Sequence, residues 1–162
     1  HARDKDTIVS SLLIAEMAAF YNSKGTSIYK ELQKLYQEFG YYLEGIKSVT
    51  LTGKDGIEKM ANLMTELRET VKDRTIDKNI KIKRDFKTKK ELIVATGEEK
   101  DILLPVENVI QFVLEDDTYI TARPSGTEPK IKFYFSVNAP TKEEVEKKLN
   151  ETMEKFVATL KL

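Results

Sequence analysis

The sequence contains no cysteine, so no disulfide framework can hold the fold together. This absence fits a protein of the reducing cytoplasm. No apolar run is long enough to span a bilayer, and no signal-peptide pattern is found. The sequence therefore gives no indication of a membrane partner or of secretion.

An excess of charge of either sign is also absent. Lys and Arg together number 27, and so do Asp and Glu, which makes the net charge zero. No overall field then favours nucleic acid or an anionic membrane, and any anion site has to be built locally. With 162 residues and 40% hydrophobic content, the chain can bury the core of one domain, with or without an appendage.

The first part of the chain predicts two amphipathic helices. Apolar residues recur at helical spacing after Asp6, a candidate N-cap, and again after Thr26 or Ser27, and a glycine ends each helix. No strand precedes the helices to cover their apolar faces. We therefore expect residues 1–44 to be the helical end of an α/β domain that starts upstream.

Residues 45–162 predict a two-layer α+β domain. A strand at Gly45–Thr52 leads into a helix that starts near Asp55, several strands follow, and a capping box of Thr141 and Glu144 opens a terminal helix. The economical arrangement is one mixed or antiparallel sheet with the helices on one face.

The segment from Arg74 to Lys90 is basic and is the one place where a nucleic-acid interface needs to be considered. Ile80 and Ile82 alternate with lysines there, which is typical of an edge strand protected by charge. Phe86 is the only aromatic residue available for base stacking. We favour the edge strand, expect no nucleic-acid partner, and assign this segment no catalytic role.

Three acidic residues, Glu115, Asp116 and Asp117, separate two runs of β-forming residues. They could be imagined as a Mg²⁺ cluster. A hairpin turn between strands at Val109–Leu114 and Thr118–Arg123 explains them more simply. We therefore expect no metal ligand here.

The octet RPSGTEPK, from Arg123 to Lys130, lies between two runs with strand patterning. Ser125, Gly126 and Thr127 are small, so their backbone amides can converge on one anion beside the guanidinium of Arg123. A proline on each side of the three residues restricts the loop before any ligand binds. The same pattern is also common in ordinary turns, so the octet alone leaves both interpretations open.

The octet and the IKFY that follows it resemble the phosphate-binding loop in the last domain of the α-D-phosphohexomutases, the phosphoglucomutase and phosphomannomutase family. Three upstream segments are similar to the end of the third domain of the long-type phosphoglucomutases. They are RDKD at 3–6, SSLLIAEMAAFY at 10–21 and FGYY at 39–42. The resemblance implies a third-domain remnant at 1–44 and a phosphate-binding last domain at 45–162.

The resemblance also implies a reaction. Members of this family interconvert hexose 1-phosphates and hexose 6-phosphates by intramolecular phosphoryl transfer. They use an enzyme phosphoserine, Mg²⁺ and a bisphosphate intermediate of the glucose 1,6-bisphosphate type. The last domain holds the phosphate that is not reacting, so hexose phosphate and the upstream domains are the expected partners.

Six residues receive a binding role by this resemblance. Arg123 would grip the phosphate, Ser125 would add a hydroxyl and an amide, and further phosphate contacts would come from Gly126, Thr127 and Lys132. Lys5, in the RDKD segment, matches a lysine that contacts the bound phosphosugar. Without the resemblance, Lys5 would be taken as part of a solvated helix start.

The resemblance places the nucleophilic serine and the Mg²⁺ loop in domains upstream of this sequence. We therefore expect no catalytic residue and no metal ligand in this chain, and no mutase activity from the chain alone. Ser125 is not the nucleophile, because His1 is the only histidine and no serine–histidine pair can be built around it.

Two other classes of function stay open at this stage. A stand-alone module that binds phosphate or sugar phosphate would use the same loop without any upstream domain. A structural or nucleic-acid interaction domain would depend on the basic segment 74–90 instead. Within the mutase family, the RDKD segment favours a phosphoglucomutase, but the sequence leaves the preference for glucose or mannose undecided.

Overall fold

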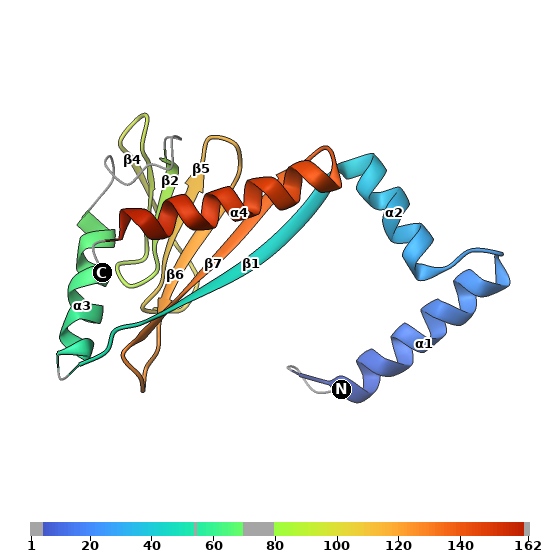
Figure 1. Ribbon diagram of the computed structural model, residues 1–162, viewed down its shortest axis with the longest axis horizontal. Coiled ribbons are helices and arrows are strands. Elements are labelled where there is room, and N and C mark those ends of the chain that lie inside the picture. Colours follow the sequence, from blue (N-terminus) through green and yellow to red (C-terminus); the bar gives the residue numbers. More distant parts are fainter. Residues whose placement is uncertain (1–4, 54, 70–79, 161–162) are drawn as a thin grey trace. The chain divides into compact units, whose positions relative to one another are not determined.

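The computed structural model describes residues 5–53, 55–69 and 80–160 (Figure 1). The chain divides into two compact units, His1–Tyr41 and Tyr42–Leu162. Which domains of a larger protein these units correspond to stays a prediction. No helix in the described ranges has both the length and the apolar character needed to cross a membrane.

The first unit contains the two predicted helices, α1 (Thr7–Ser23) and α2 (Ile28–Phe39). The side chain of Asp6 caps α1 by accepting a hydrogen bond from the Val9 amide at 2.9 Å. Ser27, one of the two candidates, is the N-cap of α2, and its hydroxyl accepts from the Lys30 amide at 3.3 Å. Both helices and their N-caps are thus confirmed, and α2 is amphipathic as predicted, whereas the apolar residues of α1 are spread around the helix.

The second unit is built on a sheet whose described part has seven strands in the order β1-β7-β6-β5-β2-β3-β4. The pairs β7–β6, β6–β5, β5–β2, β2–β3 and β3–β4 are all antiparallel. The strands are β1 (Tyr41–Thr50), β2 (Ile80–Asp85), β3 (Lys90–Ile93), β4 (Glu98–Asp101), β5 (Ile110–Leu114), β6 (Tyr119–Pro124) and β7 (Lys130–Ala139).

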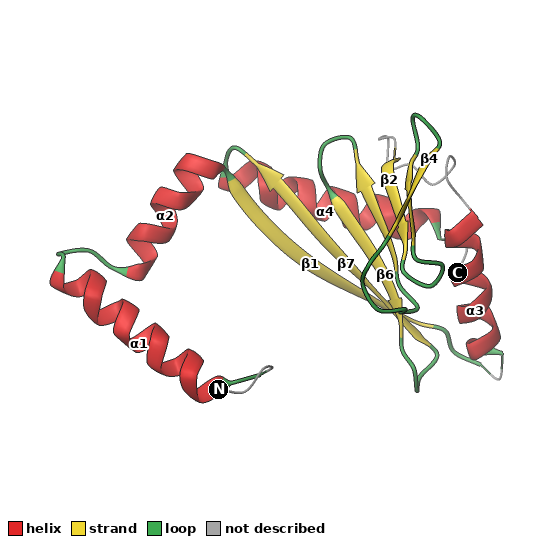
Figure 2. Cartoon of the chain, turned by 180° about the vertical axis from the view of Figure 1, so that it is seen from behind, coloured by secondary structure: helices red, strands yellow, loops and turns green. Residues whose placement is uncertain are grey.

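Two helices, α3 (Gly56–Glu69) and α4 (Lys142–Thr159), pack on the sheet. Figures 1 and 2 show α4 lying along one face, in front of the strands in one view and behind them in the other. The ring of Phe156 on α4 makes edge contacts with Phe133 and Phe135 of β7, with centroids 5.2 and 5.7 Å apart. The predicted α+β class and its helix-covered sheet are confirmed.

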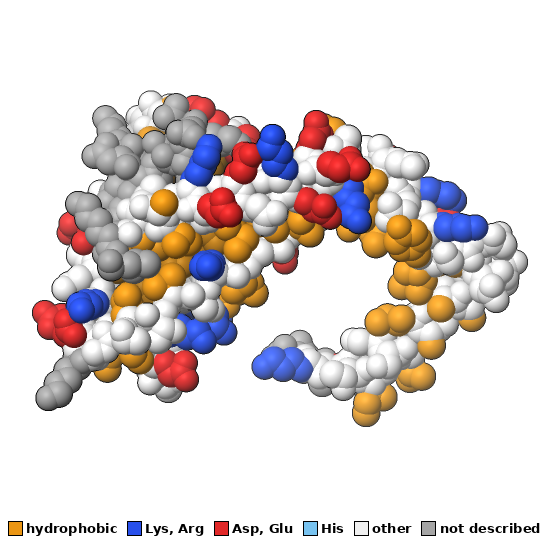
Figure 3. Space-filling model, viewed as in Figure 1, with side chains coloured by type: hydrophobic (Ala, Val, Ile, Leu, Met, Phe, Trp, Pro, Cys, Tyr) orange, Lys and Arg blue, Asp and Glu red, His pale blue; other side chains and the backbone are white. Residues whose placement is uncertain are grey.

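The outer surface of α4 carries charges of both signs, as Figure 3 shows. Ion pairs one helical turn apart, such as Lys142–Glu146 and Lys147–Glu151 at 3.8 Å, follow the helix axis. The predicted capping box is present at its start, where Thr141 and Glu144 each bond to the backbone of the other. The terminal helix therefore begins where the sequence predicted.

Three features differ from the sequence-based expectations. β1 begins at Tyr41 rather than at Gly45, and a β3–β4 hairpin was not foreseen. β2, expected at a sheet edge, lies between β5 and β3. The lysines of β2 therefore do not protect a sheet edge. Lys83 donates a hydrogen bond to the Arg68 carbonyl at 2.5 Å, and burial lowers the pKa of the Lys83 ammonium.

The contact between Phe156 and β7 generates a stability prediction. Phe156→Ala removes a side chain that is 2% exposed and leaves a cavity against two rings, so unfolding should become easier by about 3 to 5 kcal/mol. Urea unfolding followed by circular dichroism measures this. Leu103→Ala is the control, because Leu103 is 93% exposed and its truncation should change stability by less than about 0.5 kcal/mol. Equal effects of the two changes would contradict the described core.

Candidate functional site

The five loop and strand residues predicted to bind phosphate lie on the β6–β7 hairpin. Arg123 is on β6, Lys132 is on β7, and Ser125, Gly126 and Thr127 lie in the connecting loop. One face of these two strands forms part of the core, where Ala122, Ile131 and Phe133 are completely buried. Alternation along the strands therefore points Arg123 and Lys132 to the opposite face, which α3 and α4 do not cover.

The loop folds around the side chain of Ser125. The amides of Thr127 and Glu128 both donate to the Ser125 Oγ, at 3.4 and 3.3 Å. Two neighbouring amides thus converge on one oxygen atom. The amide of Ser125, by contrast, donates to the Lys130 carbonyl at 2.7 Å and continues the hairpin ladder. The sequence had placed the amides of Ser125, Gly126 and Thr127 among those available to an anion, but the amides of Ser125 and Thr127 are already paired within the hairpin.

Gly126 lies at the open tip of the loop. A Cβ built on it would meet no heavy atom within 4 Å. Gly126, Thr127 and Glu128 are all exposed, whereas Ser125 and Pro129 are half-buried. A ligand can therefore approach the tip while the base of the loop stays packed.

Three cations surround this loop on the uncovered face of the hairpin. Arg123 is directly opposite Lys132 in the strand register. Lys130 is opposite Ser125, and its carbonyl accepts a hydrogen bond from the Ser125 amide. In the ranges that the structure describes, none of the three forms an ion pair with a carboxylate. The same hairpin end carries Glu128, whose side chain is exposed. The local charge is positive although the chain as a whole is neutral.

Other cations of the second unit are neutralised by near neighbours. Arg84 of β2 lies 2.6 Å from Glu91 of β3, and Lys148 of α4 lies 2.8 Å from Asp116. Lys81 pairs with Asp117 at 3.0 Å. The acidic residues of the turn predicted between β5 and β6 thus form ion pairs with lysines. No group of three His, Asp or Glu side chains that could hold a metal ion occurs in the described residues.

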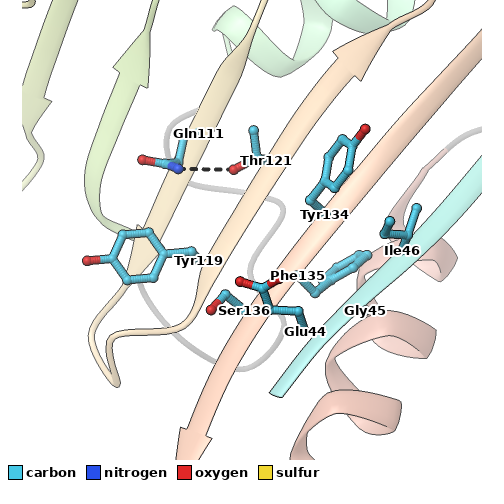
Figure 4. Close-up of a pocket in the computed structure, with 9 residues that line it drawn as sticks. All are labelled: Glu44, Gly45, Ile46, Gln111, Tyr119, Thr121, Tyr134, Phe135 and Ser136. Carbon is cyan, nitrogen blue, oxygen red and sulfur yellow. Dashed lines mark hydrogen bonds between the residues drawn. The ribbon is translucent and has the colours of Figure 1, made fainter. Parts of the chain in front are cut away.

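The uncovered face also contains a pocket of about 830 Å³ beside the three cations. Figure 4 shows Thr121 of β6 next to Tyr134 of β7. Thr121 is two residues before Arg123 on β6, and Tyr134 is two residues after Lys132 on β7. Gln111 of β5 donates to the Thr121 hydroxyl at 3.1 Å. The remaining lining residues are Glu44, Gly45, Ile46, Tyr119, Phe135 and Ser136. The sequence analysis missed this pocket because it depends on the order and register of four strands.

Lys5 belongs to the first unit, just before α1. Its backbone has a positive φ of 57°, and its carbonyl accepts a hydrogen bond from the Thr7 amide at 3.0 Å. The other members of the RDKD segment include Arg3 and Asp4, which lie outside the described residues. The role of Lys5 in binding a phosphosugar stays a prediction.

Comparison of the sequence with known proteins finds relatives that are all named phosphoglucomutase. No family model matches the chain. A phosphoglucomutase of Staphylococcus haemolyticus is 32% identical over 143 residues, which is 88% of this chain and 26% of that protein. A phosphoglucomutase of Staphylococcus aureus (strain MRSA252) is 34% identical over 148 residues, or 91% of this chain and 27% of that protein.

A solved structure adds a likeness in fold. The exocytosis-sensitive phosphoprotein pp63/parafusin of Paramecium, described as a phosphoglucomutase and solved in an open form, matches with a TM-score of 0.60. The match covers 98% of this chain and 27% of that one, at 18% identity. The chain thus spans about a quarter of the length of these relatives, and it belongs to the phosphoglucomutase family.

Proposed function

We propose that this chain supplies the phosphate-holding part of a phosphoglucomutase that interconverts hexose 1-phosphate and hexose 6-phosphate through a bisphosphate intermediate. The observation that carries the proposal is the group of three cations, Arg123, Lys130 and Lys132, which have no carboxylate partner in the described structure and lie at the end of the hairpin that carries the Ser125 hydroxyl. Family membership supports the choice of a hexose phosphate as the ligand.

The proposed grip uses the groups in the positions where the structure places them. The planar guanidinium of Arg123 can donate two parallel hydrogen bonds to a phosphate, and Lys132 adds a second charge from the opposite strand. The Ser125 hydroxyl accepts the amides of Thr127 and Glu128, so its own proton is free to be donated to a phosphate oxygen. Gly126 leaves room for the ligand at the tip.

None of these groups would take part in bond making. Holding the distal phosphate orients the other end of the sugar, so remote binding energy would serve the reaction carried out elsewhere. Lys5 keeps the role that the family resemblance gives it, a contact with the phosphosugar. Mg²⁺, which would supply charge stabilisation in phosphoryl transfer, is expected to be held by the upstream domains of the family. We assign the protein to the cytoplasm, which the lack of cysteine fits.

The proposal predicts which arginine of the uncovered face matters for anion binding. Arg123→Gln removes an unpaired cation and should weaken binding of glucose 1-phosphate to the chain about 10-fold to 100-fold, since charged hydrogen bonds contribute about 1.5 to 3 kcal/mol. Arg84→Gln is the matched control, because Arg84 lies on the same face but is already paired with Glu91. Titrations followed by amide chemical shifts, at two salt concentrations, give both affinities.

Free glucose should not compete with glucose 1-phosphate if the phosphate is the group that is held. The affinity should also fall as salt rises, because the contact is between charges. Equal losses in the Arg123 and Arg84 variants would contradict the assignment of the site. Tight binding by the chain alone, comparable with a complete enzyme, would instead favour a stand-alone sugar-phosphate module.

A second prediction concerns catalysis. The 162-residue chain, assayed with glucose 1-phosphate, glucose 1,6-bisphosphate and Mg²⁺, should form no glucose 6-phosphate above the uncatalysed background. The reason is that the phosphoserine and the metal loop of the family are expected in other domains. A coupled assay that reduces a nicotinamide cofactor as glucose 6-phosphate appears measures this. Turnover that survives purification to homogeneity would show that the chain contains a catalytic group of its own.

A further inference from the structure

The loop at residues 125–129 is tied to the rest of the fold at its base. The hydrogen bonds of Ser125, Thr127, Glu128 and Lys130 within this turn join loop residues to one another. The Pro129 carbonyl is different: it accepts a hydrogen bond at 2.8 Å from the amide of Leu51. Leu51 is buried and directly follows β1, the strand next to β7 in the sheet, so this bond joins the loop to the end of the neighbouring strand.

Gly56, the first residue of α3, fills the space beside this bond. It is buried, and a Cβ built on it would overlap the Leu51 carbonyl oxygen and lie 3.0 Å from the Cβ of Pro129. Both neighbours belong to the backbone or to a rigid ring, so neither can swing aside as a long side chain can. A side chain at position 56 therefore has to displace the Leu51 peptide, the Pro129 end of the loop, or α3.

The contacts of α3 with the rest of the domain resist a shift of this helix. Its inner face buries Leu63, Met64 and Leu67, which are 5%, 2% and 0% exposed. At its far end Arg68 pairs with the buried Asp85 of β2, with the guanidinium Nε 3.4 Å from a carboxylate oxygen. Moving the helix would break these contacts, so the Leu51 peptide gives way more easily, and its bond to the Pro129 carbonyl passes the displacement to the loop.

From these contacts we propose that Leu51 and Gly56 are positioning residues for the phosphate-binding loop. They hold Pro129, and through it they fix the place of the two amides that converge on Ser125 Oγ. Neither residue touches the ligand. This inference rests on the proposed phosphate site, but the position of the loop can be measured without any ligand.

The test compares two glycine substitutions in the full chain. Gly56→Ala introduces a methyl group against the loop support. Gly97→Ala, the control, introduces one in the β3–β4 turn at a φ of 73°, where a side chain strains the backbone and an added Cβ would meet no heavy atom within 4 Å. Amide spectra are recorded without ligand, and inorganic phosphate is then titrated at constant ionic strength, with chloride as the reference anion.

Gly56→Ala should shift the ligand-free amide signals of residues 125–128 and weaken phosphate binding about tenfold or more, since small displacements of binding groups are costly. Gly97→Ala should leave both unchanged, even though it also lowers the unfolding midpoint. A folded Gly56→Ala chain with unshifted loop signals and full phosphate affinity would overturn the inference. If the unaltered chain binds no phosphate, the proposed function fails, and the ligand-free spectra still decide the positioning role.

Hydrogen exchange in the unaltered chain provides a measurement that needs no variant to fold. Phosphate at saturation should slow exchange of the Leu51 amide, because a loop held by the anion opens less often at Pro129. The Gly97 amide, which donates to Ile93 in the distant β3–β4 turn, should exchange at its original rate. Phosphate binding that depends on Arg123 but leaves Leu51 exchange unchanged would contradict the inference.

Discussion

Two positive side chains, Arg123 and Lys132, face each other directly across an antiparallel strand pair. Like charges in this position destabilise a sheet, and the described structure provides no carboxylate that would offset the repulsion. The contrast with β2 and β3 is clear, since Arg84 there is directly opposite Glu91 and pairs with it. An anion at the end of β6 and β7 would supply the missing opposite charge. In a chain without net charge, this local imbalance is what can select a phosphate.

The buried face of the hairpin holds the two cations in register. Ala122 and Phe133 are paired directly beneath this end of the sheet, and neither is exposed to solvent. A slip of one residue would move the core side chains into water and the charged ones under α4. Phe156 adds its ring contacts to the same face of β7. The position of the two cations is thus a consequence of hydrophobic packing on the other side of the same two strands.

The sequence predicted the parts that depend on local pattern. Period-two alternation marked β7, capping residues marked α2 and α4, and small residues between prolines marked the loop. The parts it missed depend on which strands meet. β2 carries lysines as an edge strand does, yet β3 and β4 cover its free side. The amide of Ser125 was assigned to the ligand, but the ladder of β6 and β7 extends far enough to use it. Register and strand order arise from long-range packing, which no short pattern encodes.

The loop combines a fixed base with a free tip, and this division bears on its affinity for an anion. Pro124 is already paired with Ile131 in the ladder, and Pro129 is held through its carbonyl. Gly126, Thr127 and Glu128 are exposed at the tip, and the amides of Thr127 and Glu128 already donate to the Ser125 Oγ. Each residue that is fixed beforehand spares about 1 to 2 kcal/mol of backbone entropy at the moment of binding. A loop anchored in this way can bind a small anion with few contacts, provided that its anchor stays in place.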